Sequence, residues 1–424
     1  MSPVFNAEAD AKTSRFARWV QLVLGIICMV MIANFQYSWA FFVNPIDQKY
    51  HWGRAAIQFA FTIFIFTETW LAPLEGYLID KLGPRAMVCA SGVLLAIAWG
   101  LNSIADGLII LYVAAIIGGI GTGVAYFASI GNALKWFPDR RGLAVGLTAA
   151  AFGTLAVFTV GPITNMIASS GYEQTFVWFG IWQGVAVVIA GLFLRAPRPN
   201  ETLRPAAPAI QQTNRDFTPG EVLKAPTFWA MYAMFVMVGT GAMMAFGVLS
   251  LLIRDVGVGA APVTILVWTM PALQFALRLD RWLAGLSQPL FGWISDHIGR
   301  EHTMFIAFLA EGIAIYALFS FAMDPLLLVI LSGIIFFAWA EIYSLFPATC
   351  TDLYGRKYAT TNYGMLYTAK GVASLLAPFA LPFFGATRGL FVVAALLNIL
   401  AALMALIVLK PLRKRVIAQD ARFD

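Results

Sequence analysis

Long apolar runs separated by short polar connections dominate the chain. Twelve such runs cover approximately residues 19–43, 55–79, 86–104, 107–134, 142–168, 175–194, 226–253, 265–294, 303–322, 325–349, 360–386 and 388–410. A helix needs about 20 apolar residues to cross the hydrocarbon core of a bilayer. The pattern therefore predicts an all-α integral membrane protein with twelve transmembrane helices.

A polar stretch at residues 195–224 divides these runs into six and six. It contains four prolines between positions 197 and 208 and three amide side chains between positions 211 and 214. This composition is typical of a linker. We therefore expect two pseudo-symmetric six-helix bundles, at residues 1–194 and 225–424, joined by a cytoplasmic linker at residues 195–224.

The composition excludes several classes of protein. Hydrophobic residues make up 60% of the 424 residues and charged residues 12%, about half of the roughly 25% found in globular domains. A soluble enzyme, a disordered chain and a coiled coil are therefore excluded. The three cysteines lie in or beside apolar runs, and the three histidines lack metal-ligand spacing. We expect no disulfide, no metal site and no cofactor.

The net charge of +6 reflects membrane topology rather than a nucleic-acid partner. If both termini lie inside, 21 of the 28 Lys and Arg residues fall in the tails and connections on that side, and four fall on the other side. Because basic residues are retained on the cytoplasmic side, this bias predicts cytoplasmic termini. The remaining three, Arg278, Arg281 and Lys370, lie inside apolar runs.

A short motif occurs once in each half. Residues 76–85 read GYLIDKLGPR and residues 292–300 read GWISDHIGR, at an offset of 216 residues. Pro73 and Pro289 precede the two copies at the same offset. Two repeated halves are typical of a transporter whose substrate site lies between them.

The repeated motif also suggests how a conformation is held. Asp80 and Asp296 can pair with an arginine or with a helix N-terminus on the cytoplasmic side. We expect this pairing to stabilise an outward-open state. The residues expected to act in gating are Asp80, Arg85, Asp296, Arg300, Arg140 and Arg141.

Two apolar runs carry polar residues along one helix face, at steps of three or four residues. In one run these are Gln274, Arg278, Arg281, Gly285 and Gln288, and in the other Tyr363, Tyr367, Lys370 and Ser374. A charged residue at the bilayer centre costs about 2.5–3.5 kcal/mol on insertion scales, so these cations predict an anion site. The alternative for Arg278 and Arg281 is a structural pairing with Asp280 or another acid, or a position near the membrane surface.

Acidic and glycine-rich positions inside the runs leave further alternatives. Glu68, Glu75, Glu311 and Glu341 are each either a proton carrier or the partner of a buried cation. We take Glu68, Glu75 and Glu341 as the candidates for proton coupling. The glycine-rich segment 118–123 follows no strand, so Gly119 and Gly123 predict helix packing rather than a nucleotide-binding loop.

Together these features resemble the major facilitator superfamily over the whole chain. Residues 136–146, WFPDRRGLAVG, resemble a pattern of its monocarboxylate transporters, with Asp139 where lysine is usual. Residues 36–39, Trp339 with Tyr343, and residues 362–364 followed by Lys370 resemble its oxalate/formate antiporters.

The resemblance to the oxalate/formate antiporters implies a particular substrate site. In that family an arginine and a lysine hold the two carboxylates of oxalate inside a cage of aromatic residues. The lysine corresponds to Lys370, but the position of the arginine holds Gln288, so we expect another carboxylate to be preferred over oxalate. The substrate-binding residues implied are Lys370, Gln288, Arg281, Tyr37, Gln36, Tyr126, Trp339, Tyr343 and Tyr367.

The resemblance implies a secondary active transporter that exchanges small organic carboxylates by alternating access in the inner membrane of a bacterium. The alternatives are a proton-coupled monocarboxylate symporter and, more remotely, a non-transporting membrane sensor. No constellation of His, Cys and Ser residues indicates an enzyme. The expected partners are small carboxylate anions and the lipid bilayer, with no nucleic acid, and the expected state is a monomer.

Overall fold

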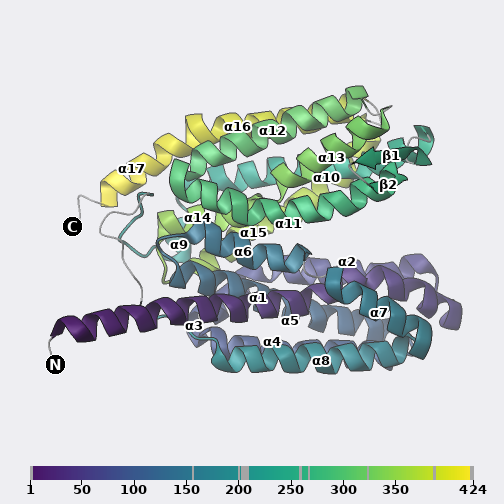
Figure 1. The fold of residues 1–424 in the computed structure, drawn as a ribbon, viewed down its shortest axis with the longest axis horizontal. Coiled ribbons are helices and arrows are strands. Elements are labelled where there is room, and N and C mark those ends of the chain that lie inside the picture. The colour runs from purple at the N-terminus through teal and green to yellow at the C-terminus, as the bar shows by residue number, and fades with distance from the viewer. Residues whose placement is uncertain are drawn as a thin grey trace. The chain divides into compact units, whose positions relative to one another are not determined.

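The computed structural model describes residues 3–154, 157–198, 201, 210–256, 260–265, 268–321, 324–384 and 388–420. The chain divides into two compact units. Unit 1 comprises Met1–Pro208 and Arg356–Met365, and unit 2 comprises Ala209–Gly355 and Leu366–Asp424. Both units are built mainly from helices (Figure 1), as the apolar pattern predicted.

The described residues of unit 1 before the linker form α1 (Pro3–Tyr50), α2 (Arg54–Trp70), α3 (Ala72–Leu82), α4 (Pro84–Ser103), α5 (Leu108–Trp136), α6 (Arg141–Thr154), α7 (Val157–Ser170) and α8 (Tyr172–Phe193). Helix α5 contacts α1, α2, α3, α4 and α6, and α8 packs along α4. Glycines allow the close approach to α5: a Cβ atom at Gly119 would lie 2.7 Å from the backbone oxygen of Phe64. A Cβ atom at Gly123 would overlap the Glu75 carboxylate. The predicted packing role of Gly119 and Gly123 is confirmed.

The second apolar run is a bent pair of helices. Helix α2 ends at Trp70, α3 begins at Ala72, and the two are bent by 51°. Pro73 lies in the first turn of α3, where its missing N–H is tolerated, but its ring opposes a continuous helix from α2. The bend therefore follows from the proline that precedes the first copy of the repeated motif.

The described residues of unit 2 form α9 (Pro219–Val222), α10 (Pro226–Val256), β1 (Pro262–Ile265), β2 (Trp268–Pro271), α11 (Ala272–Ile298), α12 (Arg300–Phe321), α13 (Pro325–Trp339), α14 (Ile342–Tyr354), most of α15 (Ala359–Phe384), α16 (Arg388–Met404), the π-helical turn η2 (Ala405–Leu409) and α17 (Lys410–Asp420). Helix α12 packs against α13 and α16, α11 packs against α13, and α10 packs against α16. Their apolar side chains, such as Ile315, Val329 and Phe391, form one core cluster.

One predicted helix boundary is wrong. The run expected to be helical from residue 265 begins with strands β1 and β2, which pair antiparallel with Val263 opposite Met270 and Ile265 opposite Trp268. Helix α11 starts only at Ala272. Apolar periodicity alone does not separate a short strand from a buried helix segment. The β-branched residues and the prolines at both ends of this segment favour the hairpin.

The described helices account for the predicted membrane spans. Nine helices or helix runs are long and apolar enough to cross a membrane, and the bent pair α2–α3 makes a tenth. The other two apolar runs correspond to α11 and α15. Trp178 and Trp182 of α8 are 62% and 65% exposed, as expected of side chains that face lipid. The chain is a multi-pass α-helical membrane protein.

The described end of the expected linker is attached to unit 2. The backbone N–H of Thr213 donates to Asp352 O at 3.0 Å, and that of Phe217 donates to Tyr354 O at 2.9 Å. Gly355 follows α14 with φ +84°, a conformation that glycine adopts without a Cβ penalty. Residues 202–209 of the linker lie outside the described residues.

Candidate functional site

Lys370 lies in the middle of α15 with a tyrosine as its partner. Its Nζ donates to the hydroxyl oxygen of Tyr367 at 2.8 Å. The same nitrogen lies 4.9 Å from the ring centroid of Tyr367 and 6.0 Å from that of Tyr343. A lysine ammonium carries three N–H donors, and Tyr367 accepts one of them. A half-buried cation held only by tyrosines is suited to bind an anion.

Aromatic side chains from four helices, α10, α13, α14 and α15, form a cluster with Lys370. The rings of Tyr343 and Tyr367 lie 6.2 Å apart, and the ring of Trp339 lies 5.7 Å from that of Tyr343. Phe235 of α10 lies 6.3 Å from Tyr343 and 6.5 Å from Tyr367. We call Phe235, Trp339, Tyr343, Tyr367 and Lys370 the lysine cage. The structure brings four sequence-predicted residues together in it, while Phe235 was missed because no motif marks it.

The helix break between α13 and α14 shapes the lysine cage. Helix α13 ends at Trp339 and α14 begins at Ile342, so Ala340 and Glu341 form the break. Trp339 and Tyr343 therefore come from different helices, although they are only four residues apart in the sequence. An interrupted helix is a common way for a transporter to line its substrate site.

The predicted aromatic residues of unit 1 form a group of their own. The rings of Tyr37 and Tyr126 lie 5.7 Å and 5.6 Å from the ring of Phe152. Phe152 of α6 was not predicted. The neighbouring Gln36 has a buried side-chain oxygen that accepts no hydrogen bond from the described residues. Gln36 thus retains an acceptor, and its amide group is available to a ligand.

Helix α11 packs on α13 through leucines rather than through the polar stripe predicted from the sequence. Leu279 and Leu283 pack on Gly333 of α13, where a Cβ atom would lie 2.8 Å from Leu283 Cδ1. On the stripe, Arg278 and Arg281 are exposed, and neither forms an ion pair or hydrogen bond with the described residues. Gln288 is buried, and its side-chain oxygen also accepts no hydrogen bond from them.

Asp280 does not pair with the neighbouring arginines. Its carboxylate is buried and accepts a hydrogen bond from Ser332 Oγ at 3.3 Å. The structural pairing that the sequence left open for Arg278 and Arg281 is therefore absent among the described contacts. No described hydrogen bond or ion pair joins Arg281 or Gln288 to Lys370 either.

Asp80 of the first motif copy is the centre of a polar cluster in unit 1. Its Oδ1 accepts from Lys135 Nζ at 2.6 Å. Its Oδ2 accepts from the backbone N–H of Thr361 at 2.8 Å and from Thr361 Oγ1 at 2.7 Å. Because Thr361 lies in the first turn of α15, the carboxylate also interacts favourably with that helix dipole. The predicted neighbour Arg85 instead donates to Leu194 O at 3.4 Å.

Glycines allow the start of α15 to reach Asp80. A Cβ atom at Gly76 would lie 2.6 Å from Thr360 O, and one at Gly364 would overlap Ala72 O. Any side chain at these positions would displace the two backbones. The glycine of the repeated motif and the glycine at residue 364 therefore serve the same contact between α3 and α15.

Asp296 of the second motif copy belongs to a buried charge network in unit 2. Arg300 pairs with Asp296 at 2.7 Å and with Asp352 at 2.9 Å. Arg413 pairs with Glu301 at 2.9 Å and approaches Asp352 at 3.9 Å. All five side chains are at most 7% exposed. Sequence reasoning missed Asp352, Glu301 and Arg413, although Asp352 is one of only two acids in residues 325–354.

The remaining predicted gating residues lie at the start of α6. Arg141 is 3% exposed, whereas the side chain of Arg140 is 57% exposed and lies 3.9 Å from Asp139. Asp139, which stands where the monocarboxylate pattern has lysine, forms an ion pair with Arg18 at 3.1 Å. The negative charge that Asp139 introduces at this position is therefore compensated by Arg18 of α1.

The buried acids of the two units share one feature. Glu75, Glu311 and Glu341 are at most 3% exposed, and no described residue donates a hydrogen bond to their carboxyl oxygens. Glu68 is equally buried and interacts electrostatically with Glu75. Glu75, Glu311 and Glu341 form no ion pair with a cation among the described residues.

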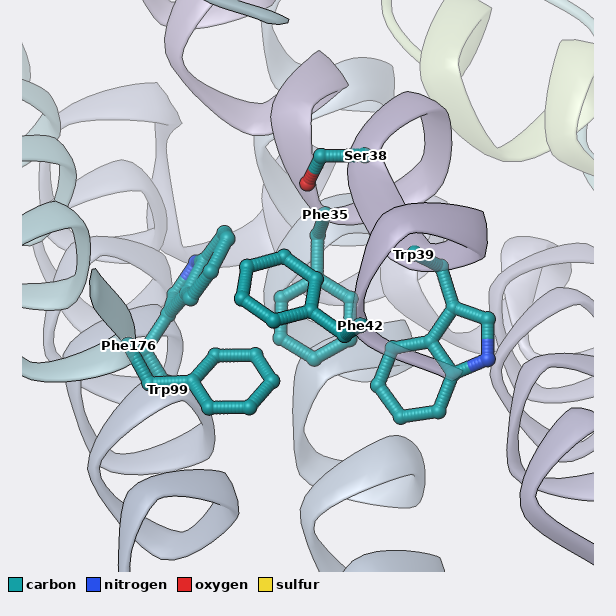
Figure 2. A pocket seen from close by; sticks show the side chains of 6 residues that line it. All are labelled: Phe35, Ser38, Trp39, Phe42, Trp99 and Phe176. Carbon is teal, nitrogen blue, oxygen red and sulfur yellow. The ribbon is translucent and has the colours of Figure 1, made fainter. Parts of the chain in front are cut away.

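Unit 1 also contains an apolar cavity that is a poor anion site (Figure 2). The space between its lining residues, Phe35, Ser38, Trp39, Phe42, Trp99 and Phe176, has no room for a water molecule. The one hydroxyl group, Ser38 Oγ, donates to Asn34 O in its own helix at 2.5 Å. The lining offers no charge to a carboxylate.

Comparison with known sequences places these features in a family. The family model of the Major Facilitator Superfamily matches residues 24–279 and 271–423. The oxalate:formate antiporter of Oxalobacter formigenes is 31% identical over 360 residues, covering 84% of this chain and 82% of the antiporter. Monocarboxylate transporter 12-B of Danio rerio is 20% identical over 354 residues, covering 72% of this chain and 68% of that transporter.

Comparison with solved structures gives the same fold. The proton:xylose symporter XylE matches with a TM-score of 0.66 at 14% identity, covering 93% of this chain and 96% of XylE. The fucose:proton symporter FucP of E. coli matches with a TM-score of 0.64 at 16% identity, covering 91% of this chain and 97% of FucP. The resemblance drawn from the sequence motifs is confirmed.

Proposed function

Because the chain belongs to the major facilitator superfamily, in the branch of the oxalate/formate antiporters, we propose that it transports small organic carboxylates by alternating access. The observation that carries this proposal is the lysine cage: an intramembrane ammonium group whose described partners are tyrosines. A bound carboxylate would supply the negative charge that compensates this ammonium group. Transport needs no covalent chemistry, and we infer that the protein is not an enzyme.

Each part of the lysine cage has a role in this proposal. Lys370 forms a charge-assisted hydrogen bond with the substrate carboxylate. Tyr367 fixes the position of the ammonium, and the rings of Trp339, Tyr343 and Phe235 exclude bulk water. Excluding water strengthens the ion pair, because the local dielectric constant falls. We also propose Tyr37, Tyr126 and Gln36 of unit 1 as substrate-binding residues.

The choice of substrate depends on the second cation. A compact dianion such as oxalate gains most from cations at both of its ends. Gln288 supplies a neutral hydrogen bond where the related antiporters are expected to carry arginine. Arg281 lies seven residues earlier, roughly 10 Å along the helix axis. We therefore propose a monocarboxylate or a longer carboxylate as the preferred substrate.

The two motif copies hold conformations of the transporter. Asp80 ties α3 to the first turn of α15, and Arg300 ties Asp296 to the end of α14. Arg85, Arg140 and Arg141 lie at or beside other helix ends, and we propose that they also act in gating. We propose that these contacts form and break once per transport cycle.

The bias of the basic residues supports an orientation with both termini and the linker in the cytoplasm. We propose that the protein works as a monomer in the inner membrane of a bacterium.

A specific observation favours a second mode of transport, proton-coupled symport of a monocarboxylate. The carboxyl groups of Glu75 and Glu341 are buried and pair with no described cation, as expected of groups that bind protons, and Glu68 lies buried beside Glu75.

Transport in proteoliposomes tests the proposal. The reconstituted protein should take up labelled formate, lactate or oxalate, and an excess of the same unlabelled anion inside should accelerate uptake by exchange. Lactate or formate should compete better than oxalate. Absence of both uptake and exchange for every carboxylate, with folded protein in the vesicles, would contradict the proposed function.

A further inference from the structure

We propose that Glu311 and Glu341 form a proton-binding site in unit 2, and that proton binding there promotes anion binding at Lys370. This inference rests on the proposed function and assigns its coupling ion. It begins from two carboxyl groups, one in the middle of α12 and the other in the break between α13 and α14.

Both carboxyl groups are removed from water and from hydrogen-bond donors. Glu311 and Glu341 are 0% exposed. None of the four carboxyl oxygens accepts a hydrogen bond from a described residue. The two groups are close enough to interact electrostatically. A pair of buried acids without donors therefore lies inside unit 2.

No described cation compensates this pair. Residues 226–245 of α10 and residues 389–409 of α16 and η2 contain no charged residue. On α11, Asp280 bonds to Ser332, and Arg278 and Arg281 are exposed. At the ends of α12 and α14, Arg300 and Asp352 pair with each other. On α15, the described partners of Lys370 are tyrosines.

Two ionised carboxylates cannot remain together in such a place. Burying even one unpaired charge has an effective cost of several kcal/mol, and a second charge of the same sign adds repulsion. Two carboxyl groups that share a site relieve this by holding a proton. At least one of Glu311 and Glu341 is therefore protonated in this arrangement.

The position of Glu341 links this proton to the lysine cage. Glu341 lies between Trp339 and Tyr343, whose rings are in contact at 5.7 Å. Tyr343 in turn lies 6.0 Å from Lys370 Nζ. If the break between α13 and α14 rearranges and exposes Glu341 to water, the rings of Trp339 and Tyr343 in the lysine cage therefore move as well.

The sign of the coupling follows from charge. A substrate carboxylate at Lys370 cancels the positive charge that favours ionised Glu341, so anion binding favours protonation. By thermodynamic reciprocity, protonation raises the affinity for the anion. A proton and a carboxylate would then bind together on one side of the membrane and leave together on the other, which is symport.

Gradient-driven uptake tests this inference in proteoliposomes. An imposed inside-alkaline pH gradient should drive net uptake of labelled lactate by the unmodified protein. Glu341→Gln and Glu311→Gln should reduce this uptake by about tenfold, within the range of typical coupling between sites. Both variants should retain exchange of labelled lactate at equal pH on the two sides. Glu221→Gln, which changes a partly exposed residue of α9 outside the proposed membrane spans, should behave like the unmodified protein.

Three outcomes would overturn the inference while leaving the proposed function intact. The first is exchange with no response of net uptake to a pH gradient. The second is a response to a sodium gradient instead. The third is loss of proton-driven uptake in Glu75→Gln with none in Glu341→Gln or Glu311→Gln, which would place the proton site in unit 1.

Infrared spectroscopy provides a test that does not depend on transport. The unmodified protein should show the carbonyl stretching band of a protonated carboxyl group, and Glu341→Gln or Glu311→Gln should remove part of it. An unchanged band in both folded variants would overturn the inference. Loss of the band together with the absence of carboxylate transport would instead support the proton site and contradict the proposed function.

Discussion

The ammonium nitrogen of Lys370 lies 2.8 Å from the hydroxyl oxygen of Tyr367, which precedes it by one helical turn. The contact holds the cation in a fixed direction and leaves two of its N–H donors for a ligand. It also places an aromatic face beside the charge, with the ring centroid 4.9 Å from Nζ. In the proposed substrate site, the cation is therefore positioned before the anion arrives.

Tyr367→Phe should weaken substrate binding without abolishing transport. The variant keeps the ring but removes the hydroxyl group, and a hydrogen bond to a charged group contributes about 1.5–3 kcal/mol at most. We expect the half-saturating concentration for exchange to rise by roughly ten- to 100-fold. Tyr232→Phe is a matched control. The hydroxyl group of Tyr232 in α10 lies 3.1 Å from Oγ1 of Thr368, which follows Tyr367 in α15. Equal effects of the two variants would contradict a role of Tyr367 in positioning Lys370.

Gln288→Arg should move selectivity towards oxalate. The new guanidinium would supply a second cation for the dianion at the position where the related antiporters are expected to carry one. If this side chain found no anion, its desolvation cost would impair folding or transport instead. Competition of unlabelled oxalate against labelled lactate, in both forms, measures the change.

The unmodified protein provides the counter-test for Gln288. Tight oxalate binding that is insensitive to Gln288→Ala and lost in Arg281→Gln would mean that Arg281 holds the second carboxylate. The inference from Gln288 to the preferred substrate would then be wrong.

Asp80→Asn should slow turnover while leaving selectivity unchanged. The substitution keeps the size of the side chain but removes the charge that holds Lys135 and the first turn of α15. Because hydrogen bonds to charged groups contribute about 1.5–3 kcal/mol, we expect exchange to slow by about tenfold. Lys135→Gln should have a similar effect, and the double variant should be less than additive. Altered selectivity at full turnover would contradict a gating role.

Thiol labelling should establish the orientation of the chain. Gln419 and Gln48 are both exposed positions. In intact cells, a cysteine introduced at Gln419 should be protected from impermeant thiol reagents, whereas one introduced at Gln48 should react. Thr213 of the linker is a poor position for this test, because its hydroxyl group donates to Leu353 O at 3.0 Å. Cys28 and Cys350 are buried, so only Cys89 needs prior replacement. Labelling of Gln419→Cys from outside would contradict a cytoplasmic C-terminus.

The fold and the centre of the site were predictable because they depend on local patterns. Apolar run lengths gave the helices, and the three-residue spacing of Tyr367 and Lys370 placed both on one helix face. The bend between α2 and α3 was not predicted, because residues 55–79 read as one continuous apolar span across Pro73. The hairpin at residues 262–271 was missed because its apolar residues fit a strand and a helix equally well.

The partners of the charged residues were not predictable, because tertiary packing selects them. Asp352 meets Arg300 across 52 residues of sequence, and Asp80 meets Thr361 across 281. Nothing in the local sequence distinguishes Lys135 from other basic residues at helix ends. Phe235 is one of 34 phenylalanines, and only the packing of α10 against α14 and α15 brings it to the lysine cage.

The most direct test of the central claim is the exchange of labelled carboxylate by Lys370→Gln in proteoliposomes. Removing one partner of a buried charge pair costs about 2–5 kcal/mol, so we expect affinity to fall by roughly 30-fold or more and exchange to be lost. The variant should remain inserted and monodisperse, because the described contacts of Lys370 involve only two tyrosine side chains. Carboxylate exchange at the rate and affinity of the unmodified protein would contradict the account.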